Sequence, residues 1–226
     1  MPYTERSRAN LLREGFPGER IFVTGNPIFE VLRHYDASIQ KSTILSKLGL
    51  EKRRYFLVTM HRAENVDIES RLRCLVEGVT DLHRIHGFPV VCSTHPRTRD
   101  RLERSGVGVD NDTIRFLPPF GFFDFVHLEQ NAFCVLTDSG TVQEECCIFG
   151  VPNVTIRDVT ERPETIEAGA NILSGADPEM ITQCVKTALT GSADWRVPVE
   201  YLVPGVSTVL TKIVLGYDRG PQRSRA

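Results

Sequence analysis

The sequence predicts an α/β protein with a doubly wound parallel sheet, because short apolar runs alternate with amphipathic stretches through the middle of the chain. Two of these runs, residues 55–59 and 133–137, are apolar on both faces, as strands covered on both sides of a sheet require. Strands that alternate with helices imply crossover connections, and crossovers make the strands parallel. The expected domain is therefore Rossmann-like.

Six strands are expected, at residues 55–59, 89–93, 113–117, 133–137, 152–156 and 171–175. The expected helices lie at residues 68–87, 97–106, 122–132, 141–150, 163–168 and 177–191. Apolar residues three and four positions apart mark the first of these helices. The last is marked by its ends, since Asp177 can cap it, Pro178 suits its first turn and Gly191 can end it.

The two ends of the chain are expected to lie outside this sheet. Residues 1 to about 20 have the pattern of a helix, residues 21–32 that of an extended crossing segment, and residues 201–216 that of another helix. We therefore expect three parts: an N-terminal helix with an interdomain crossing segment (1–50), the Rossmann-like domain (51–192), and a C-terminal crossover helix with a tail (193–226).

Composition and charge exclude several classes of protein. The formal net charge is −2 and the charges are interspersed, which argues against a nucleic-acid surface. The sequence contains no apolar stretch of the ~20 residues needed to span a bilayer, and the N-terminus has no apolar core of a signal peptide. The six cysteines lie mostly in apolar segments and are interpreted as reduced thiols of a cytoplasmic protein.

Ligands of an open parallel sheet bind beyond the carboxyl ends of its strands. The most informative segment there is "TDSGTVQEE", a strand end followed by a Ser139-Gly140 turn and a helix that is expected to begin near Thr141. The unpaired first amides of a helix and its dipole form an anion site suited to phosphate. Glu145 lies about one turn further and is placed to accept hydrogen bonds from ribose hydroxyls. A capped helix with a solvated acidic face is the alternative interpretation.

Two other loops at this edge carry candidate residues. Arg162, between Glu161 and Glu164, is expected to reach the phosphates of the same ligand, with those two carboxylates holding it in place. A surface ion-pair cluster is the alternative. His61, in "MHRAENVD", directly follows the first strand and suits phosphate binding or proton transfer, although lone loop histidines often have neither role.

The sequence lacks the usual motifs for nicotinamide, nucleoside-triphosphate, zinc-protease and esterase chemistry. The Cys146-Cys147 pair has neither metal-ligand spacing nor a second pair to complete a site, so no metal is expected.

Four segments together resemble the non-hydrolysing UDP-N-acetylglucosamine 2-epimerases. They are "RIFVTGNPIFEVL", "VTMHRAENVD", "STHPR" and "TDSGTVQEECCIFGVPNVTIRDVTERPETIEAGANILSG". Their order and spacing match from about residue 5 to 215. The resemblance implies the C-terminal, UDP-binding half of a glycosyltransferase-B type fold. It also implies interconversion of UDP-GlcNAc and UDP-ManNAc through elimination and re-addition of UDP, without a cofactor.

The resemblance assigns roles to individual residues. His61 matches the active-site histidine near the diphosphate, and the substrate-binding positions are Ser139, Gly140, Thr141, Glu145, Arg162, Phe125 and Phe120. Phe125 matches an aromatic residue near the uracil. Arg62 and His95 match positions that some bacterial members use for a second, activating UDP-GlcNAc.

The chain departs from the family pattern in three places. Thr141 stands where many members have a second glycine and Phe120 where many have a glutamine, which leaves room for a different sugar nucleotide. The third departure is the absence of the N-terminal domain that carries the acidic residues assigned to proton removal. The expected partners are a UDP-sugar, the missing domain or a separate chain that supplies it, and a second copy when the enzyme is complete.

Three functions remain open at this point. The first is the UDP-binding half of a UDP-GlcNAc 2-epimerase, and the second is an epimerase for a modified UDP-amino sugar. The third, from another class, is a UDP-sugar-binding module without catalysis. A glycosyltransferase donor domain is disfavoured by the combination of "TERPE" with "HRAEN".

Overall fold

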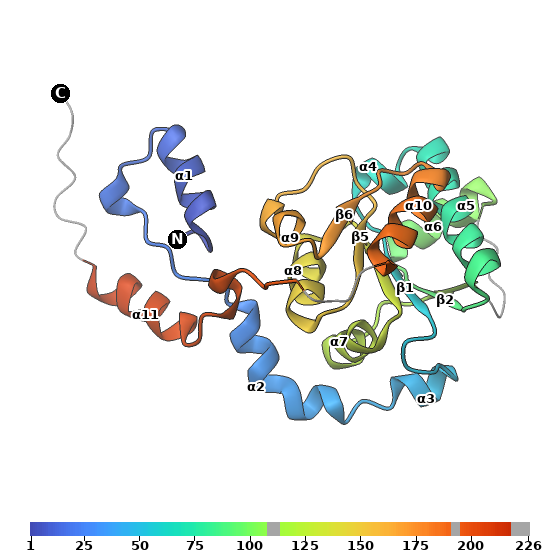
Figure 1. Cartoon of the computed structure of the whole chain (residues 1–226), viewed down its shortest axis with the longest axis horizontal. Coiled ribbons are helices and arrows are strands. Elements are labelled where there is room, and N and C mark those ends of the chain that lie inside the picture. The colour runs from blue at the N-terminus through green and yellow to red at the C-terminus, as the bar shows by residue number, and fades with distance from the viewer. Residues whose placement is uncertain (108–113, 191–194, 218–226) are drawn as a thin grey trace. The chain divides into compact units, whose positions relative to one another are not determined.

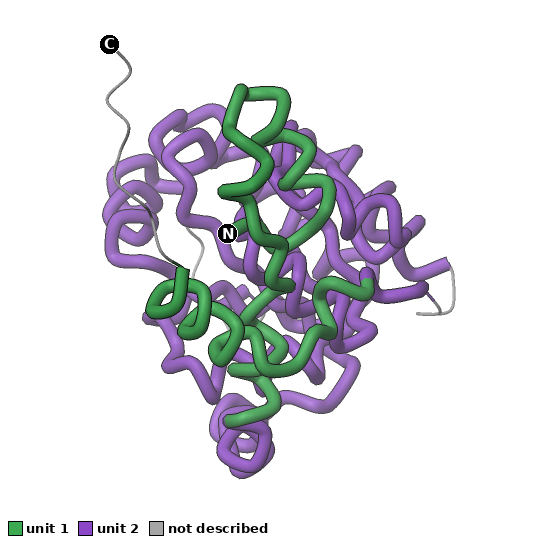
Figure 2. Tube along the Cα trace, turned by 90° about the vertical axis from the view of Figure 1, so that its left-hand side faces the viewer, with its two compact units in different colours: residues 1–34, 199–226 green, residues 35–198 purple. Residues whose placement is uncertain are grey.

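The computed structural model describes residues 1–107, 114–190 and 195–217. The chain divides into two compact units, residues 1–34 with 199–226 (unit 1) and residues 35–198 (unit 2) (Figure 2). Thr113 and Gly191, expected to begin a strand and to end a helix, lie outside the described residues. None of the described helices combines the length and apolarity that crossing a lipid bilayer requires.

Unit 2 is built on a six-stranded, entirely parallel sheet, as the sequence predicts. Its strands are β1 (Phe56–Thr59), β2 (Val90–Ser93), β3 (Ile114–Leu117), β4 (Cys134–Thr137), β5 (Asn153–Thr155) and β6 (Asn171–Leu173). Their spatial order is β3-β2-β1-β4-β5-β6, the order of a Rossmann-type doubly wound sheet. The expected fold class is thereby confirmed.

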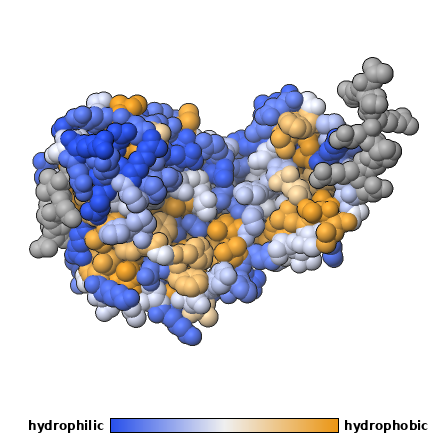
Figure 3. All heavy atoms as spheres, turned by 180° about the vertical axis from the view of Figure 1, so that it is seen from behind, coloured by the Kyte–Doolittle hydropathy of each residue, from blue (hydrophilic) through white to orange (hydrophobic). Residues whose placement is uncertain are grey.

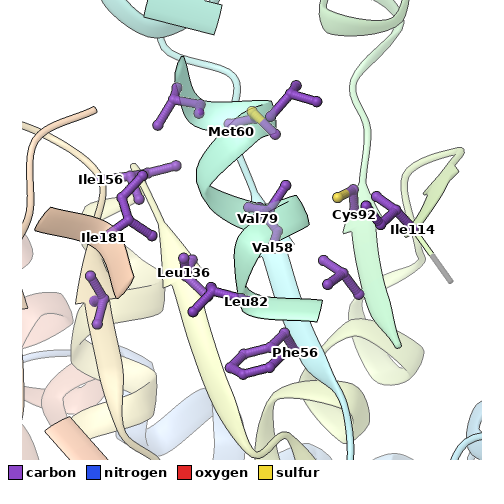
Figure 4. Close-up of a cluster of buried hydrophobic side chains, with 14 of the residues drawn as sticks. Phe56, Val58, Met60, Val79, Leu82, Cys92, Ile114, Leu136, Ile156 and Ile181 are labelled. Carbon is purple, nitrogen blue, oxygen red and sulfur yellow. The ribbon is translucent and has the colours of Figure 1, made fainter. Parts of the chain in front are cut away.

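Helices cover both faces of this sheet (Figure 1). The helices of unit 2 are α3 (Ile44–Leu48), α4 (Ala63–Val66), α5 (Glu69–His86), α6 (Pro96–Ser105), α7 (Phe122–Asn131), α8 (Gly140–Phe149), α9 (Pro163–Glu167) and α10 (Pro178–Leu189). One buried cluster joins α5, α6 and α10 to one face, and a second joins α3, α7 and α8 to the other. Strand β1 supplies alternate side chains to the two clusters: Phe56 and Val58 belong to the first (Figure 4), and Leu57 belongs to the second.

Local signals account for several helix ends in unit 2. Asp177 caps α10, because its Oδ1 accepts the backbone N–H of Met180 at 2.9 Å. Gly87 and Gly150 end α5 and α8 in the left-handed conformation. The loop after β1 differs from expectation, because it contains the short helix α4.

The described residues of unit 1 contribute no strand to a sheet and form short helices. They are α1 (Glu5–Arg13), the 3-10 turns η1 (Gly18–Arg20) and η2 (Val199–Leu202), α11 (Val206–Gly216) and the start of α2 (Ile28–Gln40), which ends in unit 2. The prediction of an extended segment at residues 21–32 is wrong from Ile28 onward, where α2 begins. There Asn26 Oδ1 accepts the N–H of Ile28 at 3.0 Å, and the chain turns into a helix.

Contacts far apart in sequence hold unit 1 together. The N–H of Asn26 donates to the carbonyl of Glu200 at 2.9 Å, and Glu30 accepts the backbone and hydroxyl of Ser207 at 2.9 and 2.6 Å. Hydrophobic residues reach the surface of both units (Figure 3), among them Val214 and Leu215 on α11.

Candidate functional site

The strand order of the sheet locates the candidate site. The order reverses between β1 and β4, the point at which open α/β sheets bind their ligands. Strands β1, β4 and β5 are neighbours and all run in the same direction. The loops after these three strands therefore meet at one edge, and they carry His61, Asp138–Gly140 and Arg157–Arg162.

A histidine and a buried carboxylate meet at the reversal point. Nδ1 of His61 lies 3.0 Å from Oδ1 of Asp138, whose side chain is 0% exposed, while that of His61 is 44% exposed. The other carboxylate oxygen, Oδ2, accepts the backbone N–H groups of His61 and Arg62, both at 2.9 Å. Asp138 therefore fixes both the backbone and the ring of His61, with one imidazole edge left exposed.

This pairing shifts the pKa of both groups. The hydrogen bond to Asp138 raises the pKa of His61, against the opposing effect of its burial. Burial raises the pKa of Asp138, but the hydrogen bonds from His61 and the neighbouring backbone outweigh it, so the pKa is lowered overall. The pair therefore favours an ionised Asp138 beside a histidine that protonates more readily, the arrangement that suits an anionic ligand or proton transfer.

Sequence reasoning missed the role of Asp138, although it lies in the quoted "DSG". It also missed Asn65, which is fully buried and donates through Nδ2 to Oδ2 of Asp138 and to the carbonyl of Ile156, both at 3.1 Å. Asn65 thus ties the loop after β1 to the ends of β4 and β5. Its place next to Glu64 in "HRAEN" gives no signal of these partners.

The turn after β4 leads directly into α8. Ser139 is the residue before the helix, and among the described residues no side chain caps its first turn. A Cβ built on Gly140 would lie 3.4 Å from Cζ and 3.5 Å from Nη2 of Arg162. The structure thus brings Ser139, Gly140 and Arg162 together, with the guanidinium beside the amide end of α8. Unpaired amides and a guanidinium together form a site with the chemistry of a phosphate receptor.

A carboxylate that was not expected binds Arg162. Its Nε donates to Oε1 of Glu144 on α8, a side chain that is buried. Glu161, one of the two carboxylates expected to hold it, binds Arg157 with its side chain, and its backbone carbonyl accepts a hydrogen bond from Arg162 Nη1 at 3.1 Å. Glu144 had no assigned role, because its distance of 18 positions from Arg162 in sequence hides the contact.

The backbone of Arg162 is held by α8 as well. Its N–H donates to Oγ1 of Thr160 at 3.0 Å, and that hydroxyl donates to Oε1 of Gln143 at 2.6 Å. Asn171 Nδ2 reaches the same Gln143 oxygen at 3.1 Å. The fully buried Gln143 therefore anchors this loop, a role that the sequence did not indicate.

Glu145 is buried rather than open to solvent. Burial raises its pKa to about 7, with a further contribution from the charge of Glu144. Glu129 of α7 is 0% exposed, and burial beside Glu145 raises its pKa well above the usual value. Burial of these two neighbouring carboxyls therefore favours the protonated form of each.

The remaining candidates are less closely grouped. Thr141 is exposed on α8, while Phe120 and Phe125 pack partly buried against the core cluster under α7 and α8. His95 is exposed, and its Nδ1 accepts the N–H of Arg97 at 3.3 Å as the cap of α6. Arg62 lies next to His61, and its Nε is buried without a hydrogen-bond partner among the described residues.

Comparisons with known proteins agree with this geometry. A family model described as UDP-N-acetylglucosamine 2-epimerase matches residues 1–202. A curated UDP-N-acetylglucosamine 2-epimerase of Methanocaldococcus jannaschii is 42% identical over 207 residues, which cover 86% of this chain and 55% of that protein. A UDP-2,3-diacetamido-2,3-dideoxy-D-glucuronate 2-epimerase of Pseudomonas aeruginosa is 42% identical over 145 residues, covering 64% of this chain and 40% of that protein.

A solved structure gives the same result. The M. jannaschii UDP-GlcNAc 2-epimerase in complex with UDP-GlcNAc and UDP superimposes with a TM-score of 0.85 at 38% identity, covering 94% of this chain and 60% of the solved one. The present chain thus spans about half the length of the curated relatives it matches. By its sequence, its sheet order and the loops gathered at its carboxyl edge, the chain belongs to the UDP-N-acetylglucosamine 2-epimerase family.

Proposed function

We propose that this chain is the nucleotide-binding half of a UDP-GlcNAc 2-epimerase, an isomerase that interconverts UDP-GlcNAc and UDP-ManNAc. The reaction removes the C2 proton, breaks the bond between C1 and the UDP oxygen, and leaves a 2-acetamidoglucal. UDP then adds back to C1 while a proton returns to C2 on the opposite face. One observation carries the proposal: Arg162, Gly140 and the His61–Asp138 pair gather at the reversal point of the sheet.

The proposed roles follow from this arrangement. The amides at Ser139, Gly140 and Thr141 bind the diphosphate, and Arg162 neutralises its charge. His61 lies near the same group, where its raised pKa suits it to donate a proton or a hydrogen bond to the departing UDP oxygen. Glu145 accepts from the ribose hydroxyls, and Phe125 with Phe120 borders the uracil.

Two finer assignments belong to the same proposal. Arg62 and His95 are proposed to contribute to an effector site for a second UDP-GlcNAc, as the family resemblance implies. The division into residues 1–50, 51–192 and 193–226 is proposed as the functional division, with UDP bound by the middle part.

The substrate has one specific alternative. The P. aeruginosa relative acts on a diacetamido uronate, and it is as similar in the matched region as the archaeal enzyme. Thr141 and Phe120 depart from the usual family residues at the nucleotide turn and at the uracil. An epimerase for a modified UDP-amino sugar is therefore the second candidate, and a UDP-sugar-binding module without catalysis is the third.

The reaction needs partners beyond the described site. We propose that acidic residues of a second domain, on this or another polypeptide, remove the C2 proton, and that the complete enzyme is a homodimer. A cytoplasmic location is part of the proposal, supported by six free thiols of which five are buried.

Calorimetry with UDP tests the binding proposal directly. UDP should bind to the chain, and Arg162→Ala should weaken this binding by roughly 1.5–3 kcal/mol, the value of a hydrogen bond to a charged group. Uridine, which lacks phosphates, should bind both forms equally. Equal UDP affinity of the two forms would show that Arg162 does not bind UDP. Absence of UDP binding by the unaltered chain would refute the whole proposal.

A further inference from the structure

A buried arginine with no assigned role in ligand binding joins two of the loops that form the site. The Arg157 side chain is only 4% exposed, and all three guanidinium nitrogens are engaged. Its Nε donates to Oε1 of Glu64 at 2.6 Å, and its Nη1 and Nη2 donate to the two oxygens of Glu161 at 2.8 and 3.1 Å. The bidentate bond to Glu161 has the fixed geometry that only an arginine fork provides.

The two carboxylates belong to different loops of the sheet edge. Glu64 lies in α4, within the loop after β1, and Glu161 lies in the loop after β5. Since β4 lies between β1 and β5, Arg157 connects the loops on either side of the β4–α8 turn. Arg71 strengthens this connection, because it donates to Oδ1 of Asn65 at 2.8 Å and to Oδ2 of Asp158 at 3.0 Å.

Both carboxylates of this connection lie close in sequence to residues of the proposed diphosphate site. Glu161 is the residue immediately before Arg162, and Arg162 Nη1 donates to its carbonyl. Glu64 is three residues after His61 and follows the backbone amides that Asp138 accepts. The carboxylates neutralise Arg157, which keeps it from serving as a ligand itself.

We propose that Arg157 is a positioning residue, which locks the loop of His61 to the loop of Arg162 and so sets the affinity for a diphosphate ligand without touching it. This inference rests on the proposed function. It adds that the arginine that binds phosphate depends on a second arginine, which is fully engaged with protein carboxylates. A lysine at position 157 keeps the charge but cannot form the fork, so it should release the Arg162 loop.

A double-mutant cycle with Arg162 separates positioning from general stability. Arg157→Lys should raise the dissociation constant for UDP about tenfold and leave uridine binding unchanged. In an Arg162→Ala background the same change should have no further effect on UDP, because Arg157 acts through Arg162. Arg104→Lys is the matched control: Arg104 pairs with Asp100 on α6, 3.0 Å away on an exposed surface, and UDP affinity should not change.

The outcomes are distinct. Unchanged UDP affinity in Arg157→Lys overturns the inference while leaving the proposed function intact, and so does an effect that persists fully without Arg162. Failure of the unaltered chain to bind UDP overturns both. If Arg157→Lys does not fold, Glu161→Gln replaces it, because it weakens the same fork from its half-exposed end. Glu161→Gln must then weaken UDP binding, leave uridine binding unchanged, and have no further effect on UDP in the Arg162→Ala background.

Discussion

Nδ1 of His61 lies 3.0 Å from Oδ1 of Asp138, across the point where the strand order of the sheet reverses. The two residues are 77 positions apart in sequence, and only the parallel pairing of β1 with β4 brings them together. Asp138 is the completely buried member and His61 the exposed one. The carboxylate therefore orients the ring, and the ring remains partly exposed at the edge where the ligand is proposed to bind.

Asp138→Asn should lower the pKa of His61, because the charge that stabilises the imidazolium is removed. NMR titration of the His61 ring protons measures this. The variant should also lose about 1.5–3 kcal/mol of unfolding free energy. An unchanged His61 titration would contradict the pairing.

The signs of the pH dependence follow from the two shifts. The pKa of His61 is raised in the folded state, so its contribution is fully present below its unfolded value and is lost as pH rises through the folded value. The pKa of Asp138 is lowered, so its contribution is lost as pH falls through the folded value. In Asp138→Asn, the unfolding free energy should therefore depend less on pH, both at acidic pH, where Asp138 gains its proton, and where His61 loses its proton.

Glu145→Gln should make the protein more stable at pH 8. The pKa of Glu145 is raised to about 7 by burial, so the folded state keeps a proton that the unfolded state releases, and stability falls as pH rises toward 7. A neutral amide removes this dependence and should raise the unfolding free energy by about 1–3 kcal/mol at pH 8. Urea unfolding at pH 5 and pH 8 measures it, and a difference that does not grow with pH would contradict the shift.

Glu145→Gln should also alter ligand binding. If the carboxylate accepts the ribose hydroxyls, UDP affinity should fall between pH 8 and pH 6 as Glu145 gains its proton. In the glutamine variant, the part of this pH dependence that comes from Glu145 should disappear. The parts that come from His61 and from the UDP phosphate should remain. Titration calorimetry on both forms at each pH gives the difference, and parallel profiles would remove Glu145 from the nucleotide site.

Gly25→Ala should destabilise unit 1 strongly. Gly25 has φ +84°, and an added Cβ would lie 2.7 Å from Cβ of Val203 and 3.1 Å from the carbonyl of Glu200. Strain and overpacking together should cost about 3 kcal/mol. Gly205→Ala is the control: it has a similar φ of +70° but open space around it, and should cost only about 1 kcal/mol. Hydrogen exchange of the α11 amides measures the destabilisation in both variants. Equal destabilisation would contradict the close approach of Gly25 to Val203.

The sheet was predictable because its signal is local and repeated. Residues such as Phe56, Leu57 and Val58 are apolar on both faces of a strand, and crossover helices between such strands leave few possible topologies. The start of α2 at Ile28 was not predictable in this way. It depends on one hydrogen bond that the Asn26 side chain accepts from the Ile28 backbone, in a stretch whose apolar residues suit an extended segment equally well.

The site was predictable by loop and only partly by residue. The rule that ligands lie beyond the carboxyl ends of strands selected the loops of His61, Gly140 and Arg162, and the structure brings these residues to one edge. It could not select Glu144 or Arg157, because their partners are set by tertiary contacts. Arg157 and Glu64 are 93 positions apart, and nothing in either segment indicates the other.

The 226 residues, expressed by themselves, should bind UDP without catalysing epimerisation. Epimerisation needs a base that removes the C2 proton and a group that returns one on the opposite face. Three carboxylates among the described residues of the site are already bound: Asp138 by His61, Glu144 by Arg162 and Glu161 by Arg157. Glu145 is buried against Glu129, so none of these four carboxylates is placed as an open base, and His61 is the proposed catalytic group that remains.

One group cannot hold C2 between two opposed catalytic residues, and such positioning supplies ~7–11 kcal/mol of a barrier. Incubation with UDP-GlcNAc in deuterated water, followed by proton NMR, should therefore show an unchanged C2 proton while calorimetry shows bound UDP. A UDP-GlcNAc 2-epimerase that spans the full length of the curated relatives is the positive control. Deuterium entering C2 with the chain alone would contradict the prediction, because it would mean that this half supplies both the base and the acid.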